Sequence, residues 1–298
     1  MKYSIGLDIG GTKIAAAVVD EEGKIYSEVK LASKTSDKEK MFEQVLNALK
    51  ESIEDFEGEK EDILGIGIGL PGKVDRKNGI AVFQNNLPWS NFPLKDRLLE
   101  HYPKMEIKID NDVAVAAYGE HFLHKVEKEK LFTYITLSTG VASASVLNNE
   151  LIKGNGFSGE LGLIPVMSEL EDNKLKPLEK CTSGVAIEEY GREYYEDQEL
   201  TTKDIFDRYY ADESKAKEII QGVAKSLAYG FVSIISLLDP EKIIIGGSVA
   251  VHHPVLIDLV KENLDELLID AQKDAIERMS VSTHPNAALI GSASQLFL

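Results

Sequence analysis

The stretch Ile5–Asp20, IGLDIGGTKIAAAVVD, decides how the rest of the chain is interpreted. An apolar run carries Asp8 near its end, breaks at two adjacent glycines, adds Thr12 and Lys13, and gives way to a second apolar run. This pattern predicts a strand, a glycine turn and a second strand. Adjacent glycines let backbone N–H groups face an anion, so the turn predicts a phosphate site, with Asp8 holding hydrated Mg²⁺ against the phosphate oxygens. The alternative is an ordinary β-hairpin whose polar residues face water.

Length and charge restrict the class of protein. A chain of 298 residues suggests about two domains of ~100–200 residues each. The formal charge of −17 disfavours binding to nucleic acid or to an anionic membrane. The single cysteine, Cys181, cannot form an internal disulfide, and apolar runs such as Phe231–Leu238 are shorter than the ~20 residues of a membrane span. We therefore expect a cytoplasmic protein.

Two segments predict how the first sheet is covered. The sequence Ser36–Glu39 resembles a capping box that opens a helix with one apolar face, which would pack on a sheet. The stretch Ile63–Leu70, ILGIGIGL, predicts a strand with glycine at alternate positions, so one of its faces carries almost no side chains. Something must approach that face closely, and the pattern favours a tightly packed helix over direct contact with a ligand.

Polar residues gather at two further places. The loop Gln84–Trp89, QNNLPW, could supply an amide to a polar ligand, although such loops are commonly simple turns. The acid-amide-acid sequence Asp110-Asn111-Asp112 lies between a predicted strand, Met105–Ile109, and a predicted helix from Val113 to about Phe122. Open α/β sheets place ligands at such a strand end, but Asn and Asp are also good helix N-caps. Both interpretations stay open at this point.

The opening plan occurs a second time. Residues 131–137 form an apolar run, Ser138-Thr139-Gly140 a small polar turn, and residues 141–147 a second run. Two such hairpins predict two similar domains that face each other across a cleft, each with a phosphate-binding turn. A third turn, Gly246-Gly247-Ser248, follows a short predicted strand and leads into a helix N-terminus suited to a nucleotide.

Seven motifs in order along the chain resemble the ROK family of bacterial sugar kinases, within the actin/hexokinase-like ATPase superfamily. They are DIGGTK (8–13), GLPGKVD (69–75), NNLPW (85–89), DNDVAVAAYGE (110–120), GELGLIPV (159–166), LEKCTSG (178–184) and IIIGG (243–247). The resemblance implies an α/β, two-domain actin-like ATPase (ribonuclease H-like) fold with a cleft between duplicated domains. We expect the first domain to span residues 1–112 plus 284–298, with the C-terminal helix packing back on it. The larger second domain would span residues 113–283.

The resemblance also assigns roles to individual residues. It makes Asp112 the general base that takes the proton of the sugar's 6-hydroxyl, and it implies four residues that bind the other hydroxyls: Asn86, Asn111, Glu160 and Glu179. Carboxylates and amides suit this task because a wrong epimer would leave them unpaired. The predicted nucleotide-binding residues are Asp8, Gly10, Gly11, Thr12, Lys13, Thr139, Gly140, Gly246 and Gly247.

The function implied is ATP-dependent phosphorylation of a hexose, most simply a glucokinase-like reaction at the 6-hydroxyl, with ATP and Mg²⁺. The alternatives are a kinase for a β-glucoside, N-acetylmannosamine or fructose, or a catalytically weak sugar-binding protein that kept the fold. The resemblance also implies a homodimer. The partners expected are therefore a small sugar and ATP, with neither nucleic acid nor a membrane.

The chain departs from the family pattern in two regions. The family commonly binds a structural zinc through a histidine after GE-x-G and a nearby cysteine cluster. Here Leu163 takes the place of the histidine, and Cys181 stands where the family has no ligand, so no zinc is expected. In the second turn the family usually has glycines, whereas this chain has five other small residues whose side chains could crowd the phosphates: Ser138, Val141, Ala142, Ser143 and Ala144.

Overall fold

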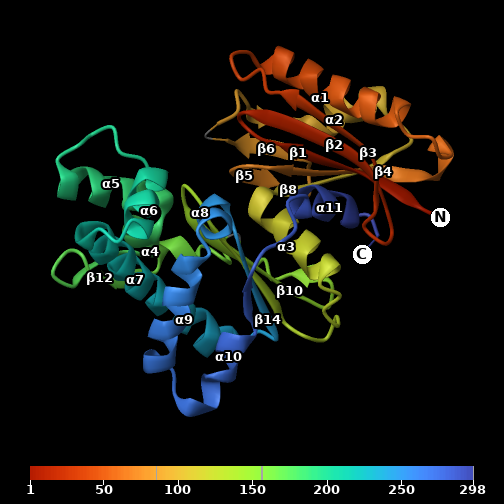
Figure 1. Cartoon of the computed structure of the whole chain (residues 1–298). Helices are drawn as coiled ribbons and strands as arrows, with labels where there is room; N and C mark the ends of the chain where they lie inside the picture. The colour runs from red at the N-terminus through yellow and green to blue at the C-terminus, as the bar shows by residue number, and fades with distance from the viewer. Residues whose placement is uncertain (85, 156, 298) are drawn as a thin grey trace. The chain divides into compact units, whose positions relative to one another are not determined.

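The chain forms two compact units in a computed structural model that describes residues 1–84, 86–155 and 157–297 (Figure 1). Unit 1 comprises Met1–Val126 and His284–Leu298, and unit 2 comprises Glu127–Thr283. The predicted boundary after Asp112 differs from this division, because the helix that follows Asp112 belongs to unit 1. That helix packs so tightly on the C-terminal helix that a Cβ on Gly119 would lie 1.8 Å from the backbone oxygen of Ala287.

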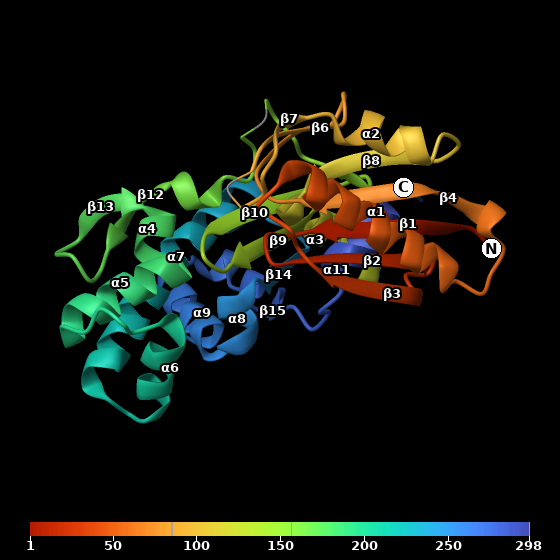
Figure 2. The same ribbon diagram turned by 90° about the horizontal axis from the view of Figure 1, so that it is seen from above.

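Unit 1 is built on a five-stranded sheet of order β3-β2-β1-β4-β8, with a small three-stranded sheet beside it of order β5-β6-β7. Figures 1 and 2 show α1 on one side of the large sheet and α3 and α11 on the other. The described elements are β1 (Tyr3–Ile9), β2 (Lys13–Asp20), β3 (Ile25–Ala32), α1 (Lys38–Glu54), η1 (Lys60–Asp62), β4 (Ile63–Leu70), β5 (Lys73–Asp75), β6 (Ile80–Phe83), β7 (Ser90–Phe92), α2 (Leu94–His101), β8 (Glu106–Asn111), α3 (Asp112–Leu123) and α11 (Ala287–Ser294).

Unit 2 has a five-stranded sheet of order β11-β10-β9-β14-β15 and a separate hairpin of β12 and β13. Its described elements are β9 (Phe132–Leu137), β10 (Val141–Leu147), β11 (Glu150–Leu151), η2 (Leu161–Leu163), β12 (Pro165–Ser168), β13 (Lys174–Pro177), α4 (Leu178–Thr182), α5 (Gly184–Tyr195), α6 (Thr202–Tyr210), α7 (Ser214–Leu238), β14 (Lys242–Gly246), α8 (Ser248–His252), α9 (Val255–Leu267), η3 (Asp270–Gln272), α10 (Asp274–Glu277) and β15 (Met279–Val281).

The two large sheets repeat one topology. In unit 1, β1 pairs antiparallel with β2 and parallel with β4, and β4 pairs parallel with β8. In unit 2, β9 pairs antiparallel with β10 and parallel with β14, and β14 pairs parallel with β15. The duplication predicted from the two hairpins is therefore confirmed. Each glycine turn lies at the end of a central strand, where parallel strands bring their carboxyl ends together.

The alternating glycines of β4 are covered by a helix, as the sequence favoured. A Cβ on Gly67 would lie 1.7 Å from the backbone oxygen of Ser292, which is in α11, and a Cβ on Gly6 of β1 would lie 2.0 Å from that of Leu289. The absence of side chains on these strands lets α11 approach the sheet backbone directly. The C-terminal helix is thus fixed against the strands that carry the first turn.

Two helices differ from or refine the sequence analysis. The N-cap of α1 is Asp37 and not Ser36, because the Asp37 carboxylate accepts the N–H groups of Glu39 and Lys40. Helix α7 is long and apolar enough to cross a membrane by length and composition alone, but 61% of its most apolar window is buried inside the protein. Since Phe231 and its neighbours on one face are fully buried, α7 is the core helix of unit 2.

Candidate active site

The first glycine turn is held by hydrogen bonds within unit 1. The Gly10 N–H donates to the Lys13 carbonyl at 2.9 Å, and the Ser33 hydroxyl donates to the Gly10 carbonyl at 2.6 Å. Gly10 and Gly11 both lie outside the left-handed region of φ, so this turn does not need glycine for its backbone angles. With the Gly10 N–H engaged, phosphate binding here would fall to the N–H groups of Gly11 and Thr12 and to the Thr12 and Lys13 side chains.

Gly11 is needed for a close approach and not for its backbone angles. A Cβ at this position would lie 2.8 Å from the Asn86 Cβ and 3.0 Å from the Asn86 backbone oxygen. The loop that carries Asn86 therefore lies directly on the first turn. Asn85, the neighbouring residue of the NNLPW motif, lies outside the described residues. A predicted sugar-binding residue and a predicted phosphate-binding turn are thus neighbours in unit 1.

Asp8 and Asp112 form a pair of interacting carboxylates in unit 1. Partial removal from water, followed by the negative charge of Asp112, raises the pKa of Asp8 to about 6, while Lys13 acts in the opposite direction. The pKa of Asp112 is also raised by partial removal from water, against the lowering effect of the N–H that Val113 donates to its Oδ1 at 2.9 Å. The Asp112 side chain still reaches solvent. These carboxylates are suited to bind a hydrated cation or to accept a proton.

The three residues at the end of β8 have separate tasks. Asp110 is buried, and its Oδ1 accepts Arg76 Nε at 2.7 Å and Arg76 Nη2 at 2.6 Å. The Asn111 Oδ1 accepts the Ala114 N–H at 2.8 Å and so caps α3, which leaves its Nδ2 group for another partner. Asp112 is the first residue of α3 and is not the cap. The capping interpretation therefore applies to Asn111, and Asp112 is available for chemistry.

The second turn, in unit 2, is fixed by a carboxylate that the resemblance gave to the sugar. The Val141 N–H donates to Glu179 Oε2 at 3.0 Å, and a Cβ on Gly140 would lie 2.5 Å from the same oxygen. The Ser138 N–H donates to the Gly140 carbonyl at 2.9 Å and closes the turn. Thr139 is exposed at its tip. Glu179 therefore holds the turn in place through one of its two carboxylate oxygens.

The third turn lies beside the second. Gly247 has φ of +87°, and a Cβ there would lie 2.3 Å from the Leu137 carbonyl oxygen, so only glycine fits. A hollow of about 280 Å³ opens next to these turns. Its lining residues come from the second turn, α5, α6 and α8: Ser138, Thr139, Gly184, Val185, Glu188, Thr202, Lys203, Ser248, Val249, His252 and His253. Of the predicted nucleotide-binding residues, only Thr139 lines it among the described residues, although Gly247 directly precedes Ser248.

Glu160 occupies an exposed position just before η2. The preceding Gly159 has φ of +90° and packs so closely that a Cβ would lie 2.0 Å from the Ser143 carbonyl oxygen. Leu163, at the end of η2, is 60% exposed, whereas Cys181 is buried in the core of unit 2. The position that the family gives to a zinc-binding histidine therefore presents an apolar side chain to solvent.

The five substituted residues in and after the second turn differ in their surroundings. Val141 and Ser143 are buried on the inner face of β10, and the Ser143 hydroxyl donates to the Gly159 carbonyl at 3.1 Å. Side chains alternate along a strand, so these two residues point away from the face that Ala142 and Ala144 share. Of the five residues, Ser138 lines the 280 Å³ hollow.

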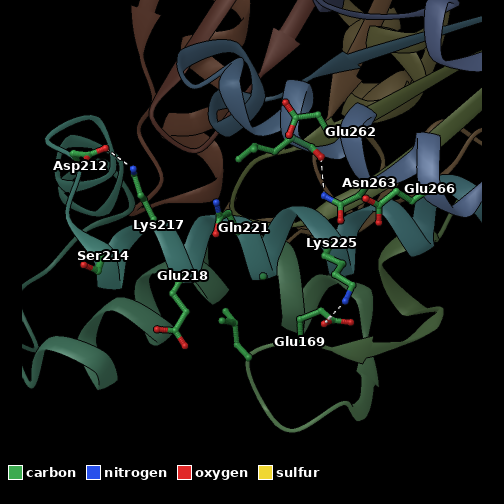
Figure 3. Close-up of a pocket in the computed structure, with 13 residues that line it drawn as sticks. Glu169, Asp212, Ser214, Lys217, Glu218, Gln221, Lys225, Glu262, Asn263 and Glu266 are labelled. Carbon is green, nitrogen blue, oxygen red and sulfur yellow. Dashed lines mark hydrogen bonds and ion pairs between the residues drawn. The ribbon is translucent and has the colours of Figure 1, made fainter.

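A larger hollow of about 710 Å³ lies elsewhere on unit 2 and holds none of the predicted site residues, all of which are described (Figure 3). Its walls come mainly from α7 and α9, and its lysines are engaged by acids: Lys225 pairs with Glu169 at 2.8 Å, and Lys217 pairs with Asp212. Glu262 and Glu266 add negative charge. This lining does not suit a nucleotide, which is itself an anion.

The predicted residues thus form two groups, one in each unit. Asp8, the first turn, Asn86, Asn111 and Asp112 lie at the carboxyl end of the unit 1 strands, and the second and third turns lie with Glu179 at the carboxyl end of β9 and β14. Sequence reasoning missed Arg76, which holds Asp110 from 34 residues away, and also Glu188 and Lys203 in the 280 Å³ hollow. No local pattern distinguishes these residues from surface charges.

Sugar kinases are among the known proteins that the chain resembles over nearly its whole length. The chain is 28% identical to a glucokinase of Halalkalibacterium halodurans, covering 97% of this chain and 93% of the relative. It is 31% identical to an N-acetylmannosamine kinase of Haemophilus influenzae, with the same shares. The crystal structure of a ROK family glucokinase from Streptomyces griseus in complex with glucose and AMPPNP matches with a TM-score of 0.77 and 27% identity, covering 98% of each chain.

This structural match shows that the chain has the two-domain actin-like ATPase fold predicted from its sequence motifs. The family model described as "ROK family" matches residues 4–297, nearly the whole chain. The repeated topology, the glycine turns and this match lead to one conclusion: the chain belongs to the ROK family.

Proposed function

We propose that this chain is a sugar kinase that transfers the γ-phosphoryl group of ATP to a hexose, most simply glucose, at its 6-hydroxyl. Glucokinases and an N-acetylmannosamine kinase are among its relatives, and the S. griseus structure contains glucose and the ATP analogue AMPPNP. The proposal takes the predicted residues of both units as parts of one reaction. It includes a homodimer and a cytoplasmic location, as expected from the sequence.

The observation that carries the proposal is the state of Asp112. Asn111 caps α3, so Asp112 is not needed as a cap, and its carboxylate reaches solvent beside Asp8 with a raised pKa. A general base works best when its pKa lies near the operating pH, and a raised pKa brings a carboxylate closer to that range. Asp112 therefore fits the role of accepting the proton of the attacking hydroxyl.

The proposal assigns sugar recognition to four polar residues. Asn86 lies on the first turn, the Nδ2 group of Asn111 is left over from its capping bond, and Glu179 keeps one oxygen after binding the Val141 N–H. Glu160 is exposed before η2. Together they offer amide donors and carboxylate acceptors, which a ring of hydroxyl groups requires.

The residues present also fit a magnesium nucleotide. Mg²⁺ prefers oxygen ligands and keeps several waters, and Asp8 offers a carboxylate on which the charges of both Lys13 and Asp112 act. A bound Mg²⁺ would neutralise phosphate charge during transfer. Lys13 and the turn N–H groups would bind phosphate oxygens, and the 280 Å³ hollow beside the second turn would receive another part of the nucleotide.

The test is a coupled ADP-release assay with ATP and Mg²⁺ over glucose, mannose, fructose, N-acetylmannosamine and a β-glucoside. The proposal expects turnover on at least one hexose, with a product whose phosphorus NMR signal is split by the two protons of C6. An aldose phosphorylated at C1 would show splitting by a single proton and would contradict the site of transfer. Sugar binding without turnover on any hexose would instead indicate the catalytically weak sugar-binding protein.

A further inference from the structure

A cluster of one carboxylate and two imidazoles lies in unit 1 in a place that neither the predicted sugar residues nor the predicted nucleotide residues occupy. Glu120 and His124 are one turn apart at the C-terminal end of α3, and His284 lies just before α11. Helices α3 and α11 pack side by side (Figure 1). Each residue offers one ligand atom, and the three atoms lie within 4.8 Å of one another.

We propose that Glu120, His124 and His284 bind one divalent transition-metal ion of the zinc class. Two imidazoles and one carboxylate, with water in the fourth position, are a common protein ligand set for zinc. Mg²⁺ instead prefers oxygen ligands in an octahedral arrangement, so this site is chemically distinct from the one proposed for a magnesium nucleotide. The cluster is separate from the region around Leu163 and Cys181, where no zinc is expected.

The distances fit such an ion. Glu120 Oε2 lies 3.1 Å from His284 Nδ1 and 3.3 Å from His124 Nε2. Ligands at ~2.0–2.2 Å from a tetrahedral zinc are separated from each other by about 3.3–3.6 Å. Two edges of the tetrahedron are therefore close to their final length. The third edge, between the two imidazoles, has to close by at most about 1.5 Å to reach the same range.

Burial gives the cluster a fixed end and an adjustable end. The Glu120 side chain is 1% exposed, whereas those of His124 and His284 are 20% and 33% exposed. The buried carboxylate sets the position of the ion, and the partly exposed imidazoles can turn toward it and leave a path for entry. A bound divalent cation would also offset the cost of burying the carboxylate.

The place of the cluster in the chain suggests what the ion does. The chain passes from unit 1 to unit 2 after Val126 and returns before His284, so two of the ligands lie next to these two connections. An ion bound by all three residues would join the end of α3 to the start of the returning segment. Metal binding therefore stabilises unit 1 at the two points where the chain leaves and re-enters it.

The alternative to a metal site is a cluster without an ion, in which protonated imidazoles pair with the carboxylate. Metal titration distinguishes the metal-bound cluster from this ion-free one. Untagged protein, stripped with a chelator, is titrated with Zn²⁺ by calorimetry and with Co²⁺ by visible absorption, in the presence of excess Mg²⁺. We expect one equivalent of Zn²⁺ to bind and the melting temperature to rise with it. Glu120→Gln, His124→Ala and His284→Ala should each weaken Zn²⁺ binding by about 100-fold or more, since changes in outer-shell residues alone cost ~10–100-fold.

His101→Ala is the matched control, because His101 is an exposed histidine of the same unit outside the cluster. It should bind Zn²⁺ like the wild type. The near-isosteric Glu120→Gln variant keeps the test valid where an alanine variant folds poorly. The proposal is overturned if the wild type binds no Zn²⁺, or if the cluster variants bind it as tightly as His101→Ala does.

Discussion

Replacing Arg76 with methionine should destabilise unit 1 by removing the partner of a buried charge. Arg76 donates through Nε and Nη2 to one oxygen of Asp110, and Asp110 directly precedes the residue that caps α3. Breaking a fully buried ion pair costs about 3–5 kcal/mol. The Arg76 side chain is 35% exposed and that of Asp110 only 4%, so solvent reduces this figure to about 2–3 kcal/mol.

Thermal unfolding followed by circular dichroism measures this loss. At about 2–4 °C per kcal/mol for a chain of this size class, the melting temperature should fall by about 4–12 °C. Glu39→Gln is the control, because Glu39 accepts both Nη groups of Arg97 in an exposed pair. Exposed pairs contribute little to stability, so Glu39→Gln should shift the melting temperature much less than Arg76→Met does.

A second variant tests the reason for the loss. In Arg76→Met, the buried carboxylate of Asp110 has lost its cation, and adding Asp110→Asn removes the charge while keeping the shape. The double variant should therefore be more stable than Arg76→Met alone. If Arg76→Met costs no more than Glu39→Gln, or if adding Asp110→Asn lowers stability further, the pair does not hold the start of α3 in the way described.

Three further predictions concern close approach and charge. Gly67→Ala places a Cβ 1.7 Å from the Ser292 carbonyl oxygen, so the free energy of unfolding measured in urea should fall by about 1–3 kcal/mol or more. An unchanged free energy of unfolding would contradict the packing of α11 on β4. Gly140→Ala places a Cβ 2.5 Å from Glu179 Oε2. Its kcat/KM should therefore fall about 10- to 100-fold with little change in melting temperature. Unchanged kinetics would argue against a role for this turn in catalysis. Because folding raises the pKa of Asp8 from 3.8 to about 6, its charge costs stability above pH 6. Asp8→Asn should therefore raise the melting temperature in metal-free buffer at high pH, by an amount that shrinks as the pH falls from 6 to 4; a gain independent of pH would show that the charge is not its cause.

Local patterns were enough to predict the strands, the turns and their duplication. The runs on either side of Gly10-Gly11 and of Ser138–Gly140 became antiparallel pairs, because apolar runs broken by small residues have few other ways to fold. The alternating glycines of β4 also indicated a closely packed helix. What the sequence lacked was the identity of that helix, since α11 lies more than 200 residues away in the chain.

The details of the site depend on contacts between distant residues, and there the sequence analysis was incomplete. It could not show that Asn111 and not Asp112 would cap α3, that Arg76 would hold Asp110, or that Gly11 would be needed for contact with Asn86. Each of these facts depends on which residues lie next to one another after folding, and the spacing of residues along the chain does not determine this. Residue types and spacing therefore indicate a site, but the task of each side chain follows from the three-dimensional packing.

The central claim is that the Asp112 carboxylate accepts the proton of the attacking sugar hydroxyl. The most direct test compares Asp112→Asn with Asp96→Asn, a change of an exposed aspartate in the first turn of α2 in the same unit. For both variants, kcat is measured by ADP release and sugar affinity by calorimetry. The account predicts that Asp112→Asn lowers kcat by about 10²- to 10⁴-fold while the sugar still binds, and that Asp96→Asn changes neither quantity. An Asp112→Asn variant that keeps the kcat of the wild type would contradict the account.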